Sequence, residues 1–102
     1  MEKFIELCSV RDIKEDEMRP FDIEDKQIML VNHSGRFFVV DRICTHADAD
    51  LSTGFLSEGN VICPLHLSAF SLIDGTPTNP PATKPIKTYT VKIENGKIFV
   101  GV

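Results

Sequence analysis

The sequence predicts an all-β fold of short antiparallel strands in a single domain, residues 1–102. Two runs rich in β-branched and aromatic residues, 27–32 and 36–41, are bounded by turn residues, which is typical of strands. Asn95-Gly96 near the C-terminus is the strongest short signal for a hairpin. A chain of 102 residues also has the size of one domain, since domains usually have about 100–150 residues.

The N-terminal half is predicted to hold four strands, at residues 3–9, 18–23, 27–32 and 36–41. Residues 10–17 are charged and should form a turn, with one helical turn around Asp12 and Ile13. Pro20 has no N–H to donate to a neighbouring strand, so the strand at 18–23 is expected at a sheet edge. His33 is placed in the turn before residue 36, where it is expected to be solvated.

The C-terminal half is predicted to hold short strands at 61–62 and 69–71 and a final hairpin of strands 86–94 and 97–102. Turns are expected at 52–54, 57–60 and 74–75. Residues 76–85 contain four prolines, which excludes a central strand or a helix there.

Four residues between these strands carry the chemistry: Cys44, His46, Cys63 and His66. Residues i and i+2 of an extended segment point to the same side, so Cys44 and His46 can face one ion. Pro64 tightens the chain between the second pair. Two thiolates and two imidazoles form a soft to borderline ligand set, which suits an iron–sulfur cluster or zinc better than magnesium or calcium.

The order of the ligands separates these two possibilities. Zinc fingers pair Cys with Cys and His with His, whereas here each short segment supplies one of each. Two cysteines on one iron and two histidines on the other is the ligation of a Rieske [2Fe–2S] centre. Cys-Thr-His, sixteen residues and Cys-Pro-Leu-His resemble the Rieske family closely. The resemblance covers about residues 36–100 and includes Gly54-Phe55-Leu56, Phe70, Asp74-Gly75, Pro80-Pro81, Tyr89 and residues 94–97.

The resemblance implies a Rieske fold, an antiparallel β-sandwich with a cluster-binding subdomain inserted at about residues 43–73. It implies one [2Fe–2S] cluster per chain, with Cys44, His46, Cys63 and His66 as its metal ligands. In similar proteins a proline-containing loop shields the cluster, and residues 76–85 are expected to do so here. A cluster with two neutral imidazole ligands carries less negative charge than one with four thiolates, so it accepts an electron more readily.

Within the Rieske range, three features of the sequence bear on the reduction potential. Respiratory members of the family have a disulfide between the two cluster loops, where this chain has Ala49 and Leu65. Phe70 replaces a tyrosine that hydrogen-bonds a cysteine sulfur in high-potential members. Both differences favour the low end of the range, whereas Ser68 aligns with a serine that donates to a bridging sulfide and favours a higher potential. Leu67 replaces a common glycine, which leaves the local backbone path open.

By resemblance, the chain is a free-standing Rieske-type ferredoxin and not itself an enzyme. It would pass single electrons from a flavoprotein NAD(P)H reductase to a terminal oxygenase such as an aromatic-ring dioxygenase. Only 36 residues follow His66, too few for the catalytic domain of an oxygenase. The alternatives are a small Rieske-like subunit of another reductase complex and a zinc-stabilised binding module.

Composition limits the other partners and the compartment. No apolar run approaches the about 20 residues of a membrane span, and acids stand where a secretory signal is basic, so a cytoplasmic monomer without membrane anchor is expected. Cys8 is expected to be a small hydrophobic residue without function.

The net charge of −4 comes from residues 43–83, which hold four acids and no Lys or Arg. This argues against nucleic acid, which needs clustered cations. The acids either keep the loops soluble or surround Leu65 and Leu67 in a docking face; they are Asp48, Asp50, Glu58 and Asp74.

Overall fold

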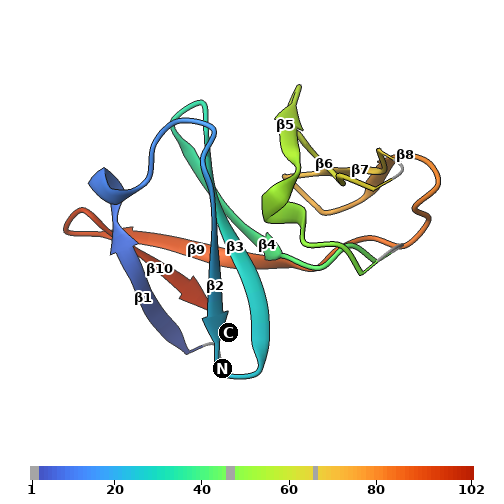
Figure 1. Cartoon of the computed structure of the whole chain (residues 1–102). Coiled ribbons are helices and arrows are strands. Elements are labelled where there is room, and N and C mark those ends of the chain that lie inside the picture. Colours follow the sequence, from blue (N-terminus) through green and yellow to red (C-terminus); the bar gives the residue numbers. More distant parts are fainter. Residues whose placement is uncertain (1–2, 46–47, 66) are drawn as a thin grey trace.

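The computed structural model describes residues 3–45, 48–65 and 67–102, and their strands form two antiparallel sheets (Figure 1). The larger sheet has six strands in the order β1-β10-β9-β4-β3-β2. The strands are β1 (Phe4–Ser9), β2 (Met18–Ile23), β3 (Lys26–His33), β4 (Arg36–Asp41), β9 (Thr88–Glu94) and β10 (Lys97–Gly101). The predicted all-β fold is confirmed.

The six-stranded sheet folds over on itself at β9. The first part of β9 pairs with β4 through Thr88 and Tyr89, and the rest of the strand pairs with β10. Because of this change of partner, β1 and β10 lie across an apolar core from β3 and β4, which makes the sandwich. Its buried residues are Ile13, Ile28, Leu30, Val39, Ile98 and Val100. Cys8 is partly buried and packs against this core, as expected.

The smaller sheet lies between β4 and β9 in the sequence and has the order β5-β6-β7-β8. Its strands are β5 (Phe55–Ser57), β6 (Asn60–Ile62), β7 (Ala69–Ser71) and β8 (Pro77–Asn79). The strands β6 and β7 were expected, whereas β5 and β8 were not. Both Pro20 in β2 and Pro77 in β8 lie in edge strands, where a missing N–H breaks no ladder.

Strand β3 has a core on each of its two faces. Four consecutive residues are fully buried, and they alternate between the cores: Ile28 and Leu30 face the sandwich, while Met29 and Val31 face the small sheet. Successive side chains of a strand point to opposite faces, so this unbroken apolar run requires cover on both sides. The cover on the second face is the small sheet with its loops.

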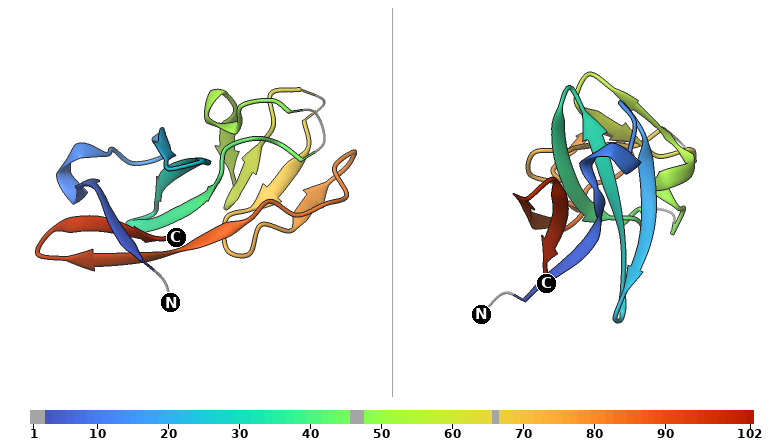
Figure 2. Two further views of the ribbon diagram at one scale, coloured as in Figure 1. Left: turned by 90° about the horizontal axis from the view of Figure 1, so that it is seen from below. Right: turned by 90° about the vertical axis from the view of Figure 1, so that its left-hand side faces the viewer.

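The small sheet leaves and rejoins the sandwich at one place. Asp41 N–H, at the end of β4, donates to the carbonyl of Lys87, just before β9, over 2.8 Å. The Tyr89 hydroxyl donates to Asp41 Oδ1 over 2.7 Å, and burial together with this carboxylate raises the pKa of Tyr89. Figure 2 shows the segment before β9 running from the small sheet into the sandwich.

Two single turns of 3₁₀ helix, at Val10–Asp12 and Leu51–Thr53, complete the regular structure of the described residues. The first begins on a capping box between Ser9 and Asp12, and its position agrees with the helical turn expected there. Neither turn, nor any other helix in the described part of the chain, has the length or apolar character needed to cross a membrane.

Gly75 lies in the turn after β7, and its carbonyl accepts a hydrogen bond from Ile86 in the segment before β9. A side chain at position 75 should therefore lower the free energy of unfolding. Gly75 and Gly59 have nearly equal φ angles, +78° and +80°. A Cβ on Gly75 would collide with the Ile86 carbonyl oxygen, whereas one on Gly59 would meet no heavy atom within 4 Å. Both alanine variants incur the left-handed strain of about 1–2 kcal/mol. Gly75→Ala should lose about 1–3 kcal/mol more from overpacking.

Chemical denaturation of the two variants measures this difference, with Gly59→Ala as the control for strain. Equal losses of unfolding free energy would contradict the close packing at Gly75.

Candidate metal centre

Two of the four predicted ligand residues, Cys44 and Cys63, lie side by side in the core beneath the small sheet. Both are free thiols, and both are completely buried. Burial raises the pKa of the Cys63 thiol, the N–H of Leu65 opposes this rise, and the adjacent Cys44 thiol adds to it. His46 and His66, the other two predicted ligands, lie outside the described residues.

The first loop, from the end of β4 to Leu51, turns sharply behind Cys44. Cys44 N–H donates to the Ala49 carbonyl over 2.8 Å, and Asp48 N–H donates to the Cys44 carbonyl over 3.1 Å. Asp48 has a φ of 53°, which this tight turn requires. Asp50 then caps the 3₁₀ turn at Leu51–Thr53, where its Oδ1 accepts from the Ser52 N–H.

The second loop joins β6 to β7 and is closed by a 2.7 Å hydrogen bond from the Cys63 N–H to the Ser68 carbonyl. Leu67 within it has a φ of 58°, in the left-handed region. Glycine occupies this region freely, while other residues incur about 1–2 kcal/mol. Leu67 therefore follows a backbone path suited to the glycine it replaces, with added strain.

The proline-containing segment, residues 76–85, is hydrogen-bonded to both loops. Asn79 Nδ2 donates to the Leu67 carbonyl over 2.9 Å, and Ala82 N–H donates to Ser68 Oγ over 3.1 Å. On the other side, Thr45 Oγ1 donates to the Lys84 carbonyl over 2.8 Å. Ala82 is buried in the same apolar core as the two cysteines. This packing supports the shielding role expected of residues 76–85, which remains a prediction.

The surroundings of the two thiols are apolar. Phe70 is fully buried beside them, and its neighbours in the core include Leu51, Val61 and Leu72. A pair of adjacent buried thiols in such surroundings fits a soft metal centre, since the thiols must lose their protons to bind and metal binding then couples to folding. The residues present therefore fit the sulfur side of an iron–sulfur cluster.

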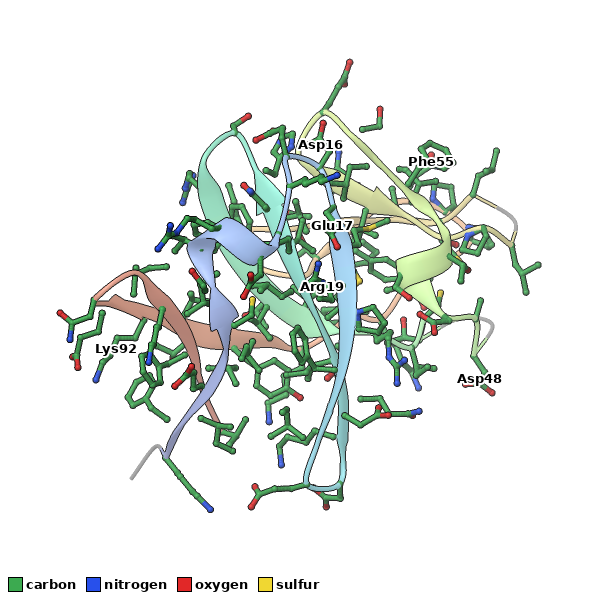
Figure 3. The ribbon with its side chains drawn as sticks, turned by 60° about the vertical axis from the view of Figure 1, so that its left-hand side comes forward. Asp16, Glu17, Arg19, Asp48, Phe55 and Lys92 are labelled. Atoms are coloured by element: carbon green, nitrogen blue, oxygen red, sulfur yellow. The ribbon has the colours of Figure 1, made fainter. Side chains whose placement is uncertain are left out.

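The expected acidic ring around Leu65 and Leu67 is wrong for two of its members. Glu58 lies in the β5–β6 turn and Asp74 follows β7, so both are at the end of the small sheet opposite Cys63. Asp48 does lie in the first loop, and it is labelled at the right of Figure 3. The pairing of the short strands thus places Glu58 and Asp74 at one end of the small sheet, away from Asp48 in the first loop.

Leu65 and Leu67 themselves are exposed, by 49% and 56%. They are the two described residues that adjoin position 66 in the second loop. Their exposure leaves an apolar pair on the surface of the second loop.

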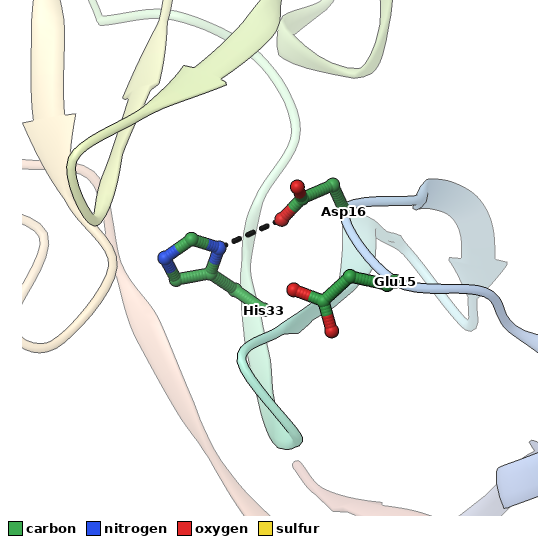
Figure 4. Close-up of side chains that lie close together, drawn as sticks. All are labelled: Glu15, Asp16 and His33. Carbon is green, nitrogen blue, oxygen red and sulfur yellow. Dashed lines mark hydrogen bonds and ion pairs between the residues drawn. The ribbon is translucent and has the colours of Figure 1, made fainter.

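The expectation that His33 is a solvated turn residue is also wrong. His33 is the last residue of β3 and is half-buried, and its Nδ1 lies 2.7 Å from Asp16 Oδ1 (Figure 4). Beside it, Ser34 N–H donates to Glu15 Oε2 over 2.7 Å. These bonds fasten the loop before β2 to the β3–β4 turn. The partner of His33 is too distant in sequence to be recognised from the pattern.

Sequence reasoning missed Thr45, Asn79, Ala82 and Arg42 as supports of the two loops. The sequence carries no signal for the first three, because each contributes one hydrogen bond to a residue far along the chain. Arg42 could have been noted as the last base before an acidic segment.

Comparison with known proteins decides the family. Residues 3–90 match the model of the Rieske [2Fe–2S] domain. The chain belongs to the Rieske family.

The relatives of this Rieske chain include ferredoxin components of oxygenase systems. It is 36% identical to the ferredoxin component of the naphthalene 1,2-dioxygenase system of Pseudomonas putida, over 96% of this chain and 94% of that protein. It is 35% identical to the ferredoxin component of the alkene monooxygenase system of Xanthobacter autotrophicus, over 97% of this chain and 81% of that protein.

A solved structure has nearly the same fold. It is a chain in the complex of reduced oxygenase and oxidized ferredoxin in carbazole 1,9a-dioxygenase. The TM-score is 0.90 at 26% identity, and the match covers 95% of this chain and 91% of that one.

Replacing Ser68 with alanine should loosen the proline-containing segment. Ser68 is fully buried, and its hydroxyl is the acceptor for the Ala82 N–H. A buried donor left without its acceptor costs about 1–3 kcal/mol, so Ser68→Ala should lower the unfolding free energy by about that amount. The Ala82 amide should also exchange its hydrogen faster, which NMR measures.

Ser57→Ala is the matched control, because Ser57 is exposed on β5. Unchanged protection of the Ala82 amide in Ser68→Ala would show that this bond does not hold the segment.

Proposed function

We propose that this Rieske protein carries one [2Fe–2S] cluster, bound by Cys44, His46, Cys63 and His66. The observation that carries the proposal is the pair of buried, adjacent thiols of Cys44 and Cys63 under the segment at Ala82. When bound, such a cluster takes up and releases one electron at a time, at about −150 to +300 mV. The spacing Cys-x-His in the first loop and Cys-x-x-His in the second supports the same ligand set.

The electron route is inferred from the relatives. The proteins similar to this chain are ferredoxin components of a naphthalene 1,2-dioxygenase system and of an alkene monooxygenase system. We infer that the chain receives electrons from a flavoprotein NAD(P)H reductase and delivers them to a terminal oxygenase. The two relatives serve different oxygenases, so the substrate is decided by the oxygenase and not by the carrier.

The residues around the thiols bear on the reduction potential. Phe70 has no hydroxyl to donate to a cysteine sulfur, which favours the low end of the Rieske range. The Ser68 oxygen accepts from the Ala82 N–H, so its own proton remains available for a sulfide. The Ser68→Ala variant should then also have a lower midpoint potential, by tens of millivolts, where about 60 mV corresponds to a tenfold change for one electron.

Iron and sulfide analysis tests the ligand set. Purified protein should contain two irons and two sulfides per chain, and its visible and EPR spectra should change on adding dithionite. Cys44→Ser and Cys63→Ser should lose the cluster and much of the fold, because metal binding and folding are coupled.

Cys8→Ser is the matched control, since this cysteine lies in β1 against the other core and should leave the cluster content unchanged. A colourless protein with one zinc would instead support the zinc-stabilised module.

Docking through the end that bears the two loops should depend on salt. Leu65 and Leu67 offer a small apolar contact there, and Asp48 is exposed in the neighbouring loop. Transient redox encounters bury less than about 1,200 Å², so charge contributes much to the encounter rate. Asp48→Asn should lower the association rate with a basic partner by about two- to fivefold at low salt, the effect of one exposed ion pair.

Glu58→Gln removes the same charge at the opposite end of the small sheet, and Glu58 and Asp48 have similar φ angles, 50° and 53°. Stopped-flow electron transfer at several ionic strengths compares the two variants. If both lower the rate equally, or if neither responds to salt, docking at the loop end is wrong.

A further inference from the structure

Arg42 lies two residues before Cys44 and joins the first loop to the edge of the large sheet. Its Nη2 is 2.6 Å from Asp22 Oδ1 on β2, and its Nη1 is 3.4 Å from Asp50 Oδ2 in the loop. We propose that Arg42 is a positioning residue for the cluster, which holds the first loop closed and places a positive charge beside it. This inference rests on the proposed function and names a residue that the ligand motif does not include.

The placement of the Arg42 side chain is unusual for a charged residue on a loop. Only 12% of the side chain is exposed. Its Nε–H is buried and has no acceptor among the described residues. Buried polar groups are nearly always paired, because a buried donor without an acceptor destabilises the fold. The other contacts of this side chain must offset that loss. Here those contacts are the two carboxylates.

The backbone of Arg42 makes the same connection. Its N–H donates to the Gln27 carbonyl in β3 over 3.0 Å, and its carbonyl accepts from the Leu51 N–H over 2.7 Å. Asp50, the partner of the guanidinium in the loop, caps the turn that begins at Leu51. Both ends of the first loop therefore meet at Arg42, and Cys44 lies between them.

The charge of Arg42 is also close in sequence to Cys44, the first of the proposed ligands. Residues 43–83 hold four acids and no Lys or Arg, and Arg42 and Lys84 are the bases that border this segment in the sequence. A cation near the centre stabilises its more negative, reduced form. Removing Arg42 would leave Asp22 and Asp50 without their cation, so the midpoint potential should fall.

Arg19 provides a matched control on the same strand as Asp22. Its Nη2 is 2.9 Å from Glu17 Oε2 and donates to the Asp12 carbonyl over 2.6 Å. Both partners precede β2 in the chain, and Figure 3 shows Arg19 and Glu17 well away from Asp48 of the first loop. Arg19 thus has an ion pair like that of Arg42 and lies on the same strand as Asp22, and its side-chain hydrogen bonds among the described residues go to Glu17 and Asp12.

The test compares Arg42→Met, Arg42→Lys and Arg19→Met as cluster-loaded proteins. Visible absorbance follows cluster release to an iron chelator, and redox titration gives the midpoint potential. Arg42→Met should release the cluster about tenfold faster, equivalent to about 1.4 kcal/mol, and should have a lower potential. Arg42→Lys should restore the potential with the charge but only part of the retention, because one ammonium cannot bridge two carboxylates as a guanidinium fork does. Arg19→Met should resemble the wild type in both.

Equal release from Arg42→Met and Arg19→Met, or an unchanged potential in Arg42→Met, overturns this inference alone. A wild-type protein that takes up no cluster overturns the proposed function with it. If Arg42→Met does not fold, Asp22→Asn removes only the 2.6 Å contact. It should then release the cluster faster than Glu17→Gln, which weakens the Arg19 pair in the same way, and equal rates again overturn the inference.

Discussion

The structure depends on the burial of β3 on both of its faces. A strand with four consecutive fully buried residues can exist only between two apolar layers, and the chain supplies one from β10 and the other from the small sheet. The two cysteines belong to the second layer, so the proposed cluster site rests on the wall that also closes the sandwich core. Substitutions at Met29 or Val31 would therefore act on the site through packing.

Three parts of the molecule hold the two cysteine loops in place. The wall of β3 and β4 lies beneath them, Arg42 ties the first loop to β2, and the proline-containing segment lies across both. Sites that move an electron benefit from supports that do not change between oxidation states, because rigid surroundings need little rearrangement. Thr45 and Asn79 each provide one such support, by bonding a carbonyl or side chain of a distant segment.

Local patterns predicted most of the strands, because alternation and turn residues act within a few positions of each other. The edge position of β2 was predicted from Pro20 in the same way. The ligand spacing predicted the family for a similar reason, since its residues belong to two short loops. The partner of His33, the separation of Glu58 from Asp48 and the left-handed Leu67 could not be predicted, because each depends on the register of strands or on a residue far away in the chain. Strands β5 and β8 were missed because β5 lies between two predicted turns, 52–54 and 57–60, and β8 begins with a proline in a proline-containing segment.

The hydrogen bond between Asp41 and Lys87 bears on how such a carrier can vary over time. The whole segment between these residues begins and ends at one point on the sandwich. The Tyr89 hydroxyl adds a second hydrogen bond to Asp41 at that point. Because its ends stay together whatever lies between them, lengthening or shortening a loop in this segment leaves the spacing of β4 and β9 unchanged, and the entropy cost grows only slowly with loop length. The loops of this segment can in this sense change in length and be refitted to a new partner, while β4 and β9 keep their pairing and the small sheet keeps its cover over β3.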